Sequence, residues 1–510
     1  MLLHVTSLPG PHGNGDLGAE AHAFAESLAR AGQRWWQVLP VGPVGYGDSP
    51  YSALSAFAGN PLLVDLDDLG VPIDEVRFPD ESVDYARAAA FREKHLRRAF
   101  QAEASRPARE RSSYRAFVER EESWLDDFAL FAALKRAHDD VEWTKWEAGV
   151  RKRERGALER ARKHHAEEIA FHKFVQWKFD LDWRKLRAFC KGLGIGLIGD
   201  LPIFVAHDSA DVWQHPELWK LDAEGACLAV AGVPPDYFST TGQRWGNPLY
   251  RWGHLAKSGY AWWVDRVRAS LERFDAVRLD HFIGFTRYWE VPAHEATAMN
   301  GRWLKGPGRP FFDAIKRQLG RAHLPFIAED LGAVTPAVTR LRRALGLPGM
   351  RIVQFAFGDD AQADHFLPHN HAARSVVYTG THDNDTVAGW FHDEGASSRS
   401  NRQVAEERRA TLAYLGRTSA DLERGLEIHW EMIRLALGSV ACTAIVPMQD
   451  VLGLGSEARM NRPGAAGGNW RWRLAPGAFT PALESRLLAD TRTYGRAPAA
   501  TPAKQEKRSS

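Results

Sequence analysis

Three polar residues, Arg278, Asp280 and His281, stand close together in an otherwise apolar run at residues 276–282. Side chains alternate along a strand, so Arg278 and Asp280 would share one face while Val277 and Leu279 share the other. Burying a guanidinium and a carboxylate together is costly unless the two groups pair. The run therefore predicts a buried ion pair at a strand end, placed either for catalysis or, as the structural alternative, only to hold the fold.

Two further apolar runs end in acidic residues. The run that begins at residue 325 ends in Glu329 and Asp330, and the run that begins at residue 376 is followed by His382 and Asp383. Each pair alone has a structural explanation, because acids favour helix starts and Asp and Asn favour turns.

Together the three strand ends are more informative than each one alone, because their carboxyl groups would converge at one place. Cleavage of a glycosidic bond needs two carboxyl groups on opposite sides of that bond, one as nucleophile or base and one as acid. Zinc chemistry would need more histidines, and phosphate chemistry would need a glycine-rich cradle. These segments therefore predict acid–base chemistry on a sugar, with neither a metal nor an organic cofactor.

The elements that must position these residues recur as eight short apolar runs with helical patterns between them. The runs are residues 2–8, 35–41, 195–203, 276–282, 325–331, 350–357, 376–381 and 444–451. Strands that alternate with helices indicate parallel βαβ units, and eight of them predict an α/β fold of the closed (β/α)₈ TIM-barrel type. A doubly wound open sheet is the alternative. In a barrel, active sites lie at the carboxyl ends of the strands, where the acidic residues stand.

The spacing of the runs predicts large insertions between barrel strands. About 150 residues separate the second run from the third, far more than one crossover needs, and we expect a helical insertion subdomain at about 66–180. A segment rich in Trp, Pro and Gly, about 206–274, is expected to be an active-site loop region. The catalytic unit would then span 1–493, and the Ala- and Pro-rich residues 494–510 would be a disordered tail.

Composition limits the partners. The 66 basic and 64 acidic residues leave a formal net charge of +2, so no strong field favours nucleic acid or an anionic membrane. The 19 Trp residues suit a neutral sugar, because aromatic faces stack on sugar rings. Three scattered cysteines indicate a reducing compartment. Without an apolar leader or a membrane span, we expect a cytoplasmic protein that is a monomer or weak homo-oligomer.

Two other patterns resemble functional sites. Gly194, Gly196 and Gly199 match the dinucleotide-binding fingerprint, but they lie at and within a predicted strand, and the helix that this motif requires does not follow. His164, His165 and His172 lie in a charged helical stretch without the spacing of a metal site. We interpret the glycines as part of a strand and the histidines as a solvated helix face.

The three strand ends resemble the pattern of α-amylase-type enzymes, and longer motifs narrow the resemblance to the amylomaltases, also called disproportionating enzymes or 4-α-glucanotransferases. The chain is similar to that family from residue 2 to about 473. The motifs that carry the resemblance are Leu2-Leu-His-Val-Thr-Ser-Leu-Pro-Gly10, Gly45-Tyr-Gly-Asp-Ser-Pro-Tyr51, Ser55-Ala-Phe-Ala-Gly-Asn-Pro61, Gly199-Asp-Leu-Pro-Ile-Phe-Val-Ala206, Pro234-Pro-Asp-Tyr-Phe238, Gly242-Gln-Arg-Trp-Gly-Asn-Pro-Leu-Tyr250 and Pro447-Met-Gln-Asp-Val-Leu-Gly-Leu-Gly455.

The resemblance implies a retaining transfer of α-1,4-glucan segments between maltooligosaccharide donors and acceptors. It implies that Asp280 is the nucleophile, which the charge of Arg278 would keep ionised. Glu329 would be the general acid/base, with a pKa near the working pH. Asp383 would be the third carboxylate, which holds sugar hydroxyls.

The resemblance also implies a set of substrate contacts, with an aromatic loop over residues 237–245. This loop would act as a lid over the cleft. In the alternative interpretation its role is only structural, and it caps the barrel. The contacts are Arg278, His281, His382, Tyr51, Gln243, Trp245 and Asn461.

Three alternatives remain open from the residues alone. An α-amylase-type or debranching hydrolase would use the same carboxylates with water as acceptor. A glucan-binding protein without activity would need the aromatic residues but not Arg278, Asp280 and Glu329. A dehydrogenase would need the glycine fingerprint to bind a dinucleotide.

Overall fold

A parallel sheet forms the centre of the computed structural model, which describes residues 1–105, 112–235, 239–393, 399–465 and 467–498. The strands are neighbours in the order β1-β2-β5-β8-β9-β10-β11, and every neighbouring pair is parallel. Their bounds are β1 Trp35–Gln37, β2 Gly196–Leu201, β5 Ala276–Leu279, β8 Phe326–Ala328, β9 Gly349–Ile352, β10 Ser375–Tyr378 and β11 Thr443–Ile445. The predicted barrel is confirmed, and each of the seven strands coincides with a predicted run, although β9, β10 and β11 begin one residue before their runs.

The eighth run is reduced to a single residue. Leu2 forms parallel bridges to Gln37 of β1 and to Pro447 after β11, which closes the circle. The predicted strand at 2–8 was wrong in its extent, because Val5–Ser7 form a 3-10 helix. Leu2 packs inside the barrel, whereas Val5 and Leu8 pack in the outer core, and this spacing is not the two-residue period of a strand.

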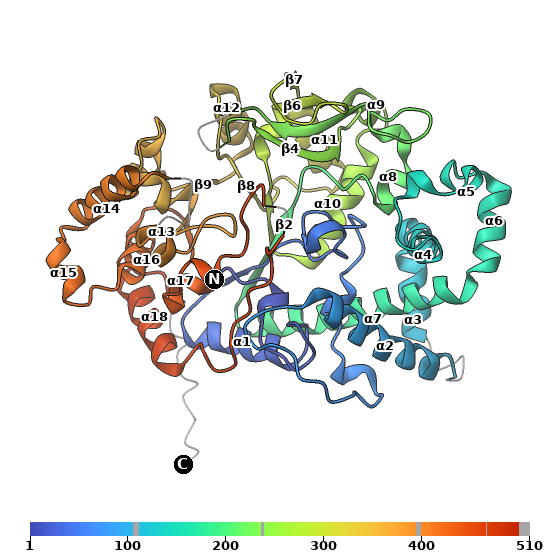
Figure 1. Cartoon of the computed structure of the whole chain (residues 1–510), viewed down its shortest axis with the longest axis horizontal. Coiled ribbons are helices and arrows are strands. Elements are labelled where there is room, and N and C mark those ends of the chain that lie inside the picture. The colour runs from blue at the N-terminus through green and yellow to red at the C-terminus, as the bar shows by residue number, and fades with distance from the viewer. Residues whose placement is uncertain (106–111, 236–238, 394–398, 466, 499–510) are drawn as a thin grey trace, which may run out of the picture.

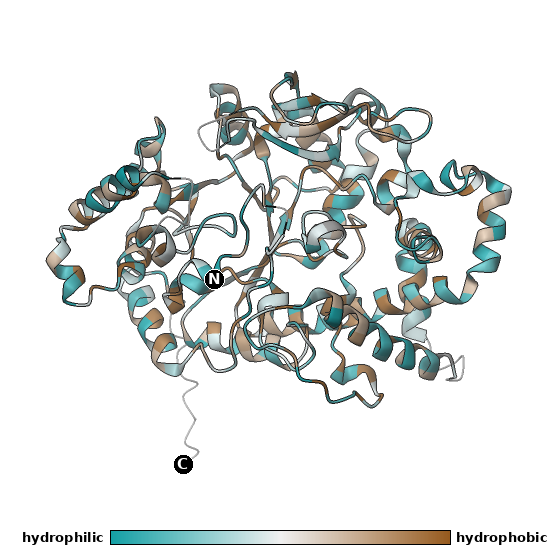
Figure 2. Cartoon of the chain, in the orientation of Figure 1, coloured by the Kyte–Doolittle hydropathy of each residue, from teal (hydrophilic) through white to brown (hydrophobic). Residues whose placement is uncertain are grey.

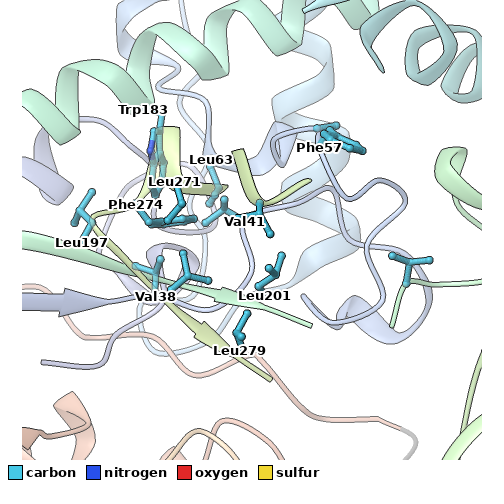
Figure 3. Packing of buried hydrophobic residues seen from close by; sticks show 14 of the residues in the cluster. Val38, Val41, Phe57, Leu63, Trp183, Leu197, Leu201, Leu271, Phe274 and Leu279 are labelled. Atoms are coloured by element: carbon cyan, nitrogen blue, oxygen red, sulfur yellow. The ribbon is translucent and has the colours of Figure 1, made fainter. Parts of the chain in front are cut away.

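Alternate strand residues serve two cores. One lies inside the barrel and includes Ile198, Met350 and Tyr378. The other lies between the barrel and its helices. Figure 3 shows its members Val38, Val41, Phe57, Leu63, Trp183, Leu197, Leu201, Leu271, Phe274 and Leu279.

Helices fill the long interval between β1 and β2. Figure 1 shows α4, α5 and α6 at the right edge of the molecule and α7 running back toward the barrel, and Figure 2 shows hydrophilic residues along α6. The bounds are α2 Tyr85–Ala104, α3 Ser112–Arg120, α4 Glu122–Ala137, α5 Ala148–Arg151, α6 Arg155–His164 and α7 Ala166–Gly192.

His172 pairs with Glu168, which also accepts two hydrogen bonds from Arg97. Within the described residues no group of three or more His, Cys, Asp or Glu could hold a metal ion.

A small antiparallel sheet lies above the barrel in Figure 1, in the order β4-β3-β6-β7. Its strands are β3 Ala229–Val233, β4 Gln243–Pro248, β6 Arg287–Pro292 and β7 Arg302–Lys305. Two of these strands, with α8 Ala210–Gln214, α9 Trp252–Lys257 and α10 Ala261–Arg273, occupy the segment 206–274 that we expected to be a loop region. This sheet was not predicted from the sequence.

Two glycines of the dinucleotide fingerprint, Gly196 and Gly199, lie in β2, whereas Gly194 lies in the turn before it. The chain continues from β2 without a helix until α8 begins at Ala210. A pyrophosphate would therefore find no helix N-terminus beside these glycines, and the interpretation as part of a strand is correct for Gly196 and Gly199.

The remaining helices surround the other barrel strands. They are α1 Ala19–Arg30, α11 Arg309–Gln318, α12 Pro336–Leu345, α13 Val387–Phe391, α14 Asn401–Leu415, α15 Ser419–Glu423, α16 Ile428–Gly438, α17 Met448–Leu452 and α18 Pro481–Thr493. Local sequence sets their ends, as in α14, where Ser400 and Gln403 form a capping box and Gly416 ends the helix in the left-handed conformation. No helix among the described residues has the length and apolar character needed to cross a membrane.

The expected tail, 494–510, lies outside the described residues from 499 onward. Before that point Arg496 is fixed by its guanidinium, which donates hydrogen bonds to the carbonyl oxygens of Leu437, Ser439 and Ala441.

Candidate active site

Arg278 is the centre of the charged site. On β5, Val277 and Leu279 point into the outer core, and the side chain of Arg278, only 5% exposed, lies on the opposite face. Its Nη1 donates to both carboxylate oxygens of Asp200, at 2.8 and 2.7 Å, and to Oδ1 of Asp280 at 2.9 Å. The predicted pairing of Arg278 with Asp280 is thus present, and it includes a second carboxylate.

Asp200 is a site residue that was not predicted from the sequence. It lies next to Arg278 because the β2–β5 register pairs these two residues directly. Its side chain is fully buried, and burial raises its pKa while the charge of Arg278 lowers it. The available signal was an acid near the end of an apolar strand, but its partner stands 78 positions away in the chain, so only the strand pairing reveals the contact.

Glu329 follows β8, the strand next to β5. Its Oε2 accepts a hydrogen bond from the backbone N–H of His281 at 2.6 Å, and its Oε1 accepts one from Leu331 at 3.1 Å. Burial, with a smaller contribution from the negative charge of Asp280, raises the pKa of Glu329 to about 8, against the opposing effect of Arg278. At neutral pH this carboxyl group therefore carries a proton that it can donate.

His281 connects the two carboxyl-bearing strands. Its backbone is left-handed, with φ of 48°, which is uncommon for a residue other than glycine. This conformation accompanies the bond from its N–H to Glu329. Burial lowers the pKa of the His281 imidazole to about 4, so the ring is neutral. Its Nε2 has no hydrogen-bond partner among the described residues.

His382 and Asp383 lie in the loop that follows β10. Asp383 Oδ1 accepts a hydrogen bond from Asn461 Nδ2 at 2.6 Å, and its Oδ2 lies 3.3 Å from Nε2 of His382. The backbone N–H of Asn461 donates to the carbonyl of His382 at 3.1 Å. The side chain of Asp383 is 44% exposed, whereas that of His382 is 4% exposed. The structure thus brings three of the predicted residues into one contact group.

Tyr51 joins the two groups of carboxylates. Its hydroxyl donates to Asp200 Oδ2 at 2.8 Å, and its ring stacks on His382 with centroids 5.2 Å apart. Burial, with the negative charge of Asp200 next, raises the pKa of Tyr51 well above its ordinary value. The negative charges of Asp280 and Asp383 also raise the pKa of this phenol.

Gln243 and Trp245 approach the site from the small sheet. Both lie on β4, and Trp245 Nε1 donates to Gln243 Oε1 at 3.1 Å. The indole of Trp245 meets the His281 ring edge to face, with centroids 4.9 Å apart, while 37% of the residue is exposed. Of the expected lid at 237–245, positions 237 and 238 lie outside the described residues, and 243–245 form a strand rather than a loop.

Comparison with known proteins shows the family of the chain. The 4-alpha-glucanotransferase family matches residues 3–479. The 4-alpha-glucanotransferase of Thermus thermophilus is 51% identical over 498 residues, which cover 96% of this chain and 97% of that protein. The chloroplastic/amyloplastic 4-alpha-glucanotransferase of Solanum tuberosum is 40% identical over 97% of this chain and 86% of its own length. The structure of the Streptococcus agalactiae amylomaltase in complex with acarbose is similar with a TM-score of 0.90 at 36% identity, covering 98% of this chain and 99% of that one. The chain therefore belongs to the 4-alpha-glucanotransferase family.

Proposed function

We propose that this enzyme transfers a segment of a 1,4-α-D-glucan to a new 4-position in an acceptor, glucose or another 1,4-α-glucan, by a retaining double displacement. The observation that carries the mechanism is a difference between two neighbouring carboxyl groups. Asp280 is paired with a buried arginine, whereas the pKa of Glu329 is raised to about 8. Such a pair divides into a nucleophile and a proton donor.

In the first half-reaction, Asp280 attacks the anomeric carbon of the donor while Glu329 gives its proton to the glycosidic oxygen that leaves. The bond between that carbon and the leaving oxygen breaks, and an ester bond to Asp280 forms. Arg278 donates a hydrogen bond to Oδ1 of Asp280 and so holds the attacking carboxylate in place.

In the second half-reaction, ionised Glu329 takes the proton from the 4-hydroxyl of the acceptor. That oxygen attacks the anomeric carbon and releases Asp280. Formation of the ester removes the negative charge of Asp280, which is one of the causes that raise the pKa of Glu329. Glu329 is therefore more readily ionised in the intermediate than in the free enzyme, as its role as base requires.

The other residues are proposed to hold the sugar. Nε2 of His281, for which the described part of the chain offers no hydrogen-bond partner, suits a sugar hydroxyl, because a buried polar atom without a partner is costly. Half-exposed Asp383 and its partner His382 would bind hydroxyls beside the cleaved bond. The groups proposed to contact the rest of the glucan are Asn461, Tyr51, Gln243 and Trp245.

Retention predicts a spacing and a stereochemical outcome. The carboxyl groups of Asp280 and Glu329 should lie about 5–5.5 Å apart, and NMR of fresh products should show the α-anomer. A β-anomer would contradict the double displacement and indicate that water or acceptor attacks directly.

Transfer and hydrolysis are distinguished by what attacks the intermediate. An oriented acceptor gains up to about 7–11 kcal/mol from effective molarity, and exposed Trp245 supplies aromatic surface to orient it. With maltotriose we expect glucose and longer maltooligosaccharides, with little net gain in reducing ends. A steady rise in reducing ends toward glucose and maltose would favour the α-amylase-type or debranching hydrolase.

We also propose the setting in which the enzyme acts. Three free cysteines, Cys190, Cys227 and Cys442, fit a reducing cytoplasm. We propose a monomer or weak homo-oligomer in which the helical region at about 66–180 forms a subdomain of the catalytic unit, 1–493. Light scattering after size exclusion would test the assembly, since a tight oligomer would contradict it.

A further inference from the structure

Asp450 is a buried carboxylate that the proposed mechanism does not use. It lies in the first turn of α17, directly after β11, and only 1% of the residue is exposed. It belongs to the motif Pro447–Gly455, to which the sequence analysis assigned no role. A buried carboxylate is costly unless hydrogen bonds compensate it, so its partners indicate why it is there.

Its two partners stand at opposite ends of one loop. Asp450 Oδ2 accepts a hydrogen bond from the hydroxyl of Thr379 at 2.5 Å, and Oδ1 accepts one from the backbone N–H of Val387 at 2.7 Å. Thr379 follows β10 directly, and Val387 is the first residue of α13. The seven residues between them include His382 and Asp383, so one carboxylate joins both ends of the loop that presents these two side chains.

The rest of the loop is held from the opposite side. Arg459 Nη2 donates to the carbonyl of Asp383 at 2.7 Å, and Asn461 contacts both His382 and Asp383. Within the loop, Asn384 Oδ1 accepts hydrogen bonds from the N–H and the hydroxyl of Thr381, each at 2.8 Å. These contacts fix the shape of the loop. Gln354, which follows β9, also holds it near both ends through backbone carbonyls, donating from its N–H to Thr379 at 3.3 Å and from its Nε2 to Asp385 at 2.9 Å.

A small cavity lies beside this loop. It has a volume of about 20 Å³ and is lined by His4, His382, Asp385, Asp450 and Arg459 among others. That space is about enough for one water molecule. The loop has fewer packing contacts on this side, so its hydrogen bonds, including those of Asp450, contribute more to its position.

We propose that Asp450 is a positioning residue for glucan transfer, which holds His382 and Asp383 in place through Thr379 and Val387. The proposal rests on the substrate-binding roles proposed for His382 and Asp383. A misplacement of about 1 Å can cost about 100-fold in rate. Loss of the carboxylate should therefore lower kcat/KM for maltotriose by about 10–100-fold in a protein that is still folded.

The experiment compares three variants with the wild-type chain. Asp450→Ala removes both hydrogen bonds. Thr379→Val removes one and keeps the carboxylate, which preserves the test if the alanine variant does not fold. The matched control is Asp182→Asn in α7, where a carboxylate of a residue 2% exposed accepts a hydrogen bond from the N–H of Asp65 at 3.0 Å, outside the proposed site.

Two measurements apply to each variant: kcat/KM for maltotriose, and hydrogen–deuterium exchange of the peptide that covers residues 379–387. We expect lower kcat/KM and faster exchange for Asp450→Ala, smaller effects in the same direction for Thr379→Val, and wild-type values for Asp182→Asn. If both site variants fold and keep wild-type exchange and kcat/KM, the proposal is wrong.

A double-mutant comparison separates positioning from general loss of stability. In a His382→Ala background, Asp450→Ala should reduce kcat/KM by a smaller factor than in the wild type, because part of its effect acts through His382. Equal factors in the two backgrounds would contradict positioning. If the wild type hydrolyses maltotriose instead of transferring it, the proposed function fails, and the exchange measurements still decide the role of Asp450.

Discussion

Substitution of Glu329 by Gln tests the charge state on which the proposed mechanism depends. The pKa of Glu329 rises from its ordinary 4.5 to about 8, mainly through burial. Between these two pH values the native protein holds a proton that the unfolded chain has released. Because the unfolded state then binds fewer protons, the free energy of unfolding falls as pH rises. The stabilising contribution of protonated Glu329 to the free energy of unfolding is therefore complete below pH 4.5 and is lost as pH rises through about 8.

The magnitude follows from the size of the pKa change. One pKa unit corresponds to about 1.4 kcal/mol, so ionisable Glu329 lowers the free energy of unfolding by roughly 3 kcal/mol at pH 7 and roughly 4 kcal/mol at pH 8. Glutamine cannot ionise, so the free energy of unfolding of the variant does not fall in this way as pH rises. It also lacks one of the two oxygens that accept the N–H groups of His281 and Leu331, at a cost of about 1–3 kcal/mol. That cost does not depend on pH, so the pH dependence isolates the charge.

The assay is calorimetric melting of the wild type and Glu329→Gln from pH 5 to pH 8. At about 2.1 cal/mol/K per residue, the 510 residues give an unfolding entropy near 1 kcal/mol/K. The Tm of the wild type relative to the variant should therefore fall by roughly 3–4 °C across this range. Other titrating groups are present in both proteins and cancel. A Tm difference that stays constant from pH 5 to pH 8 would refute the raised pKa.

Four further results are expected. Asp280→Asn should abolish transfer in a folded protein, and near-normal turnover would eliminate Asp280 as nucleophile. In the wild type, kcat/KM should fall about tenfold per pH unit above about pH 8, as Glu329 loses its proton; a flat profile to pH 10 would contradict its role as acid. Activity should survive treatment with a chelator. Loss of activity in the chelator that added metal restores would disprove metal independence. Asp200→Ala should destabilise the fold by about 3–5 kcal/mol, because Arg278 loses its most buried partner, and denaturant unfolding that shows less than about 1 kcal/mol would contradict this.

The sequence predicted the barrel and the pairing of Arg278 with Asp280 because both depend on short-range periodicity. Alternation along one strand decides which side chains share a face. Asp200 was not predicted as a site residue because it is a single acid in an apolar strand, and its partner is set by the β2–β5 register. Pairing between strands far apart in sequence leaves no local pattern.

The small sheet was not predicted from the sequence for a different reason. The first three residues of β4, Gln243, Arg244 and Trp245, are partly or fully exposed, and Gly246 has a positive φ of 84°. Polar residues and glycine are typical of loops, so the segment had no strand signature. Its strand conformation depends on pairing with β3, and this pairing also fixes Trp245 against His281.

The charges around Arg278 explain how one buried site could perform both half-reactions of the proposed mechanism. In that mechanism, Asp280 carries the negative charge and Glu329 carries the proton before transfer. Once the sugar is bound to Asp280, that charge would have moved to Glu329, and the total around Arg278 would be unchanged. Arg278 acts on both carboxyl groups, since it is bonded to Asp280 and lowers the pKa of Glu329. Because changing the net charge of a buried site is costly, moving one charge between two carboxyls beside a fixed cation avoids that cost in each direction of the cycle.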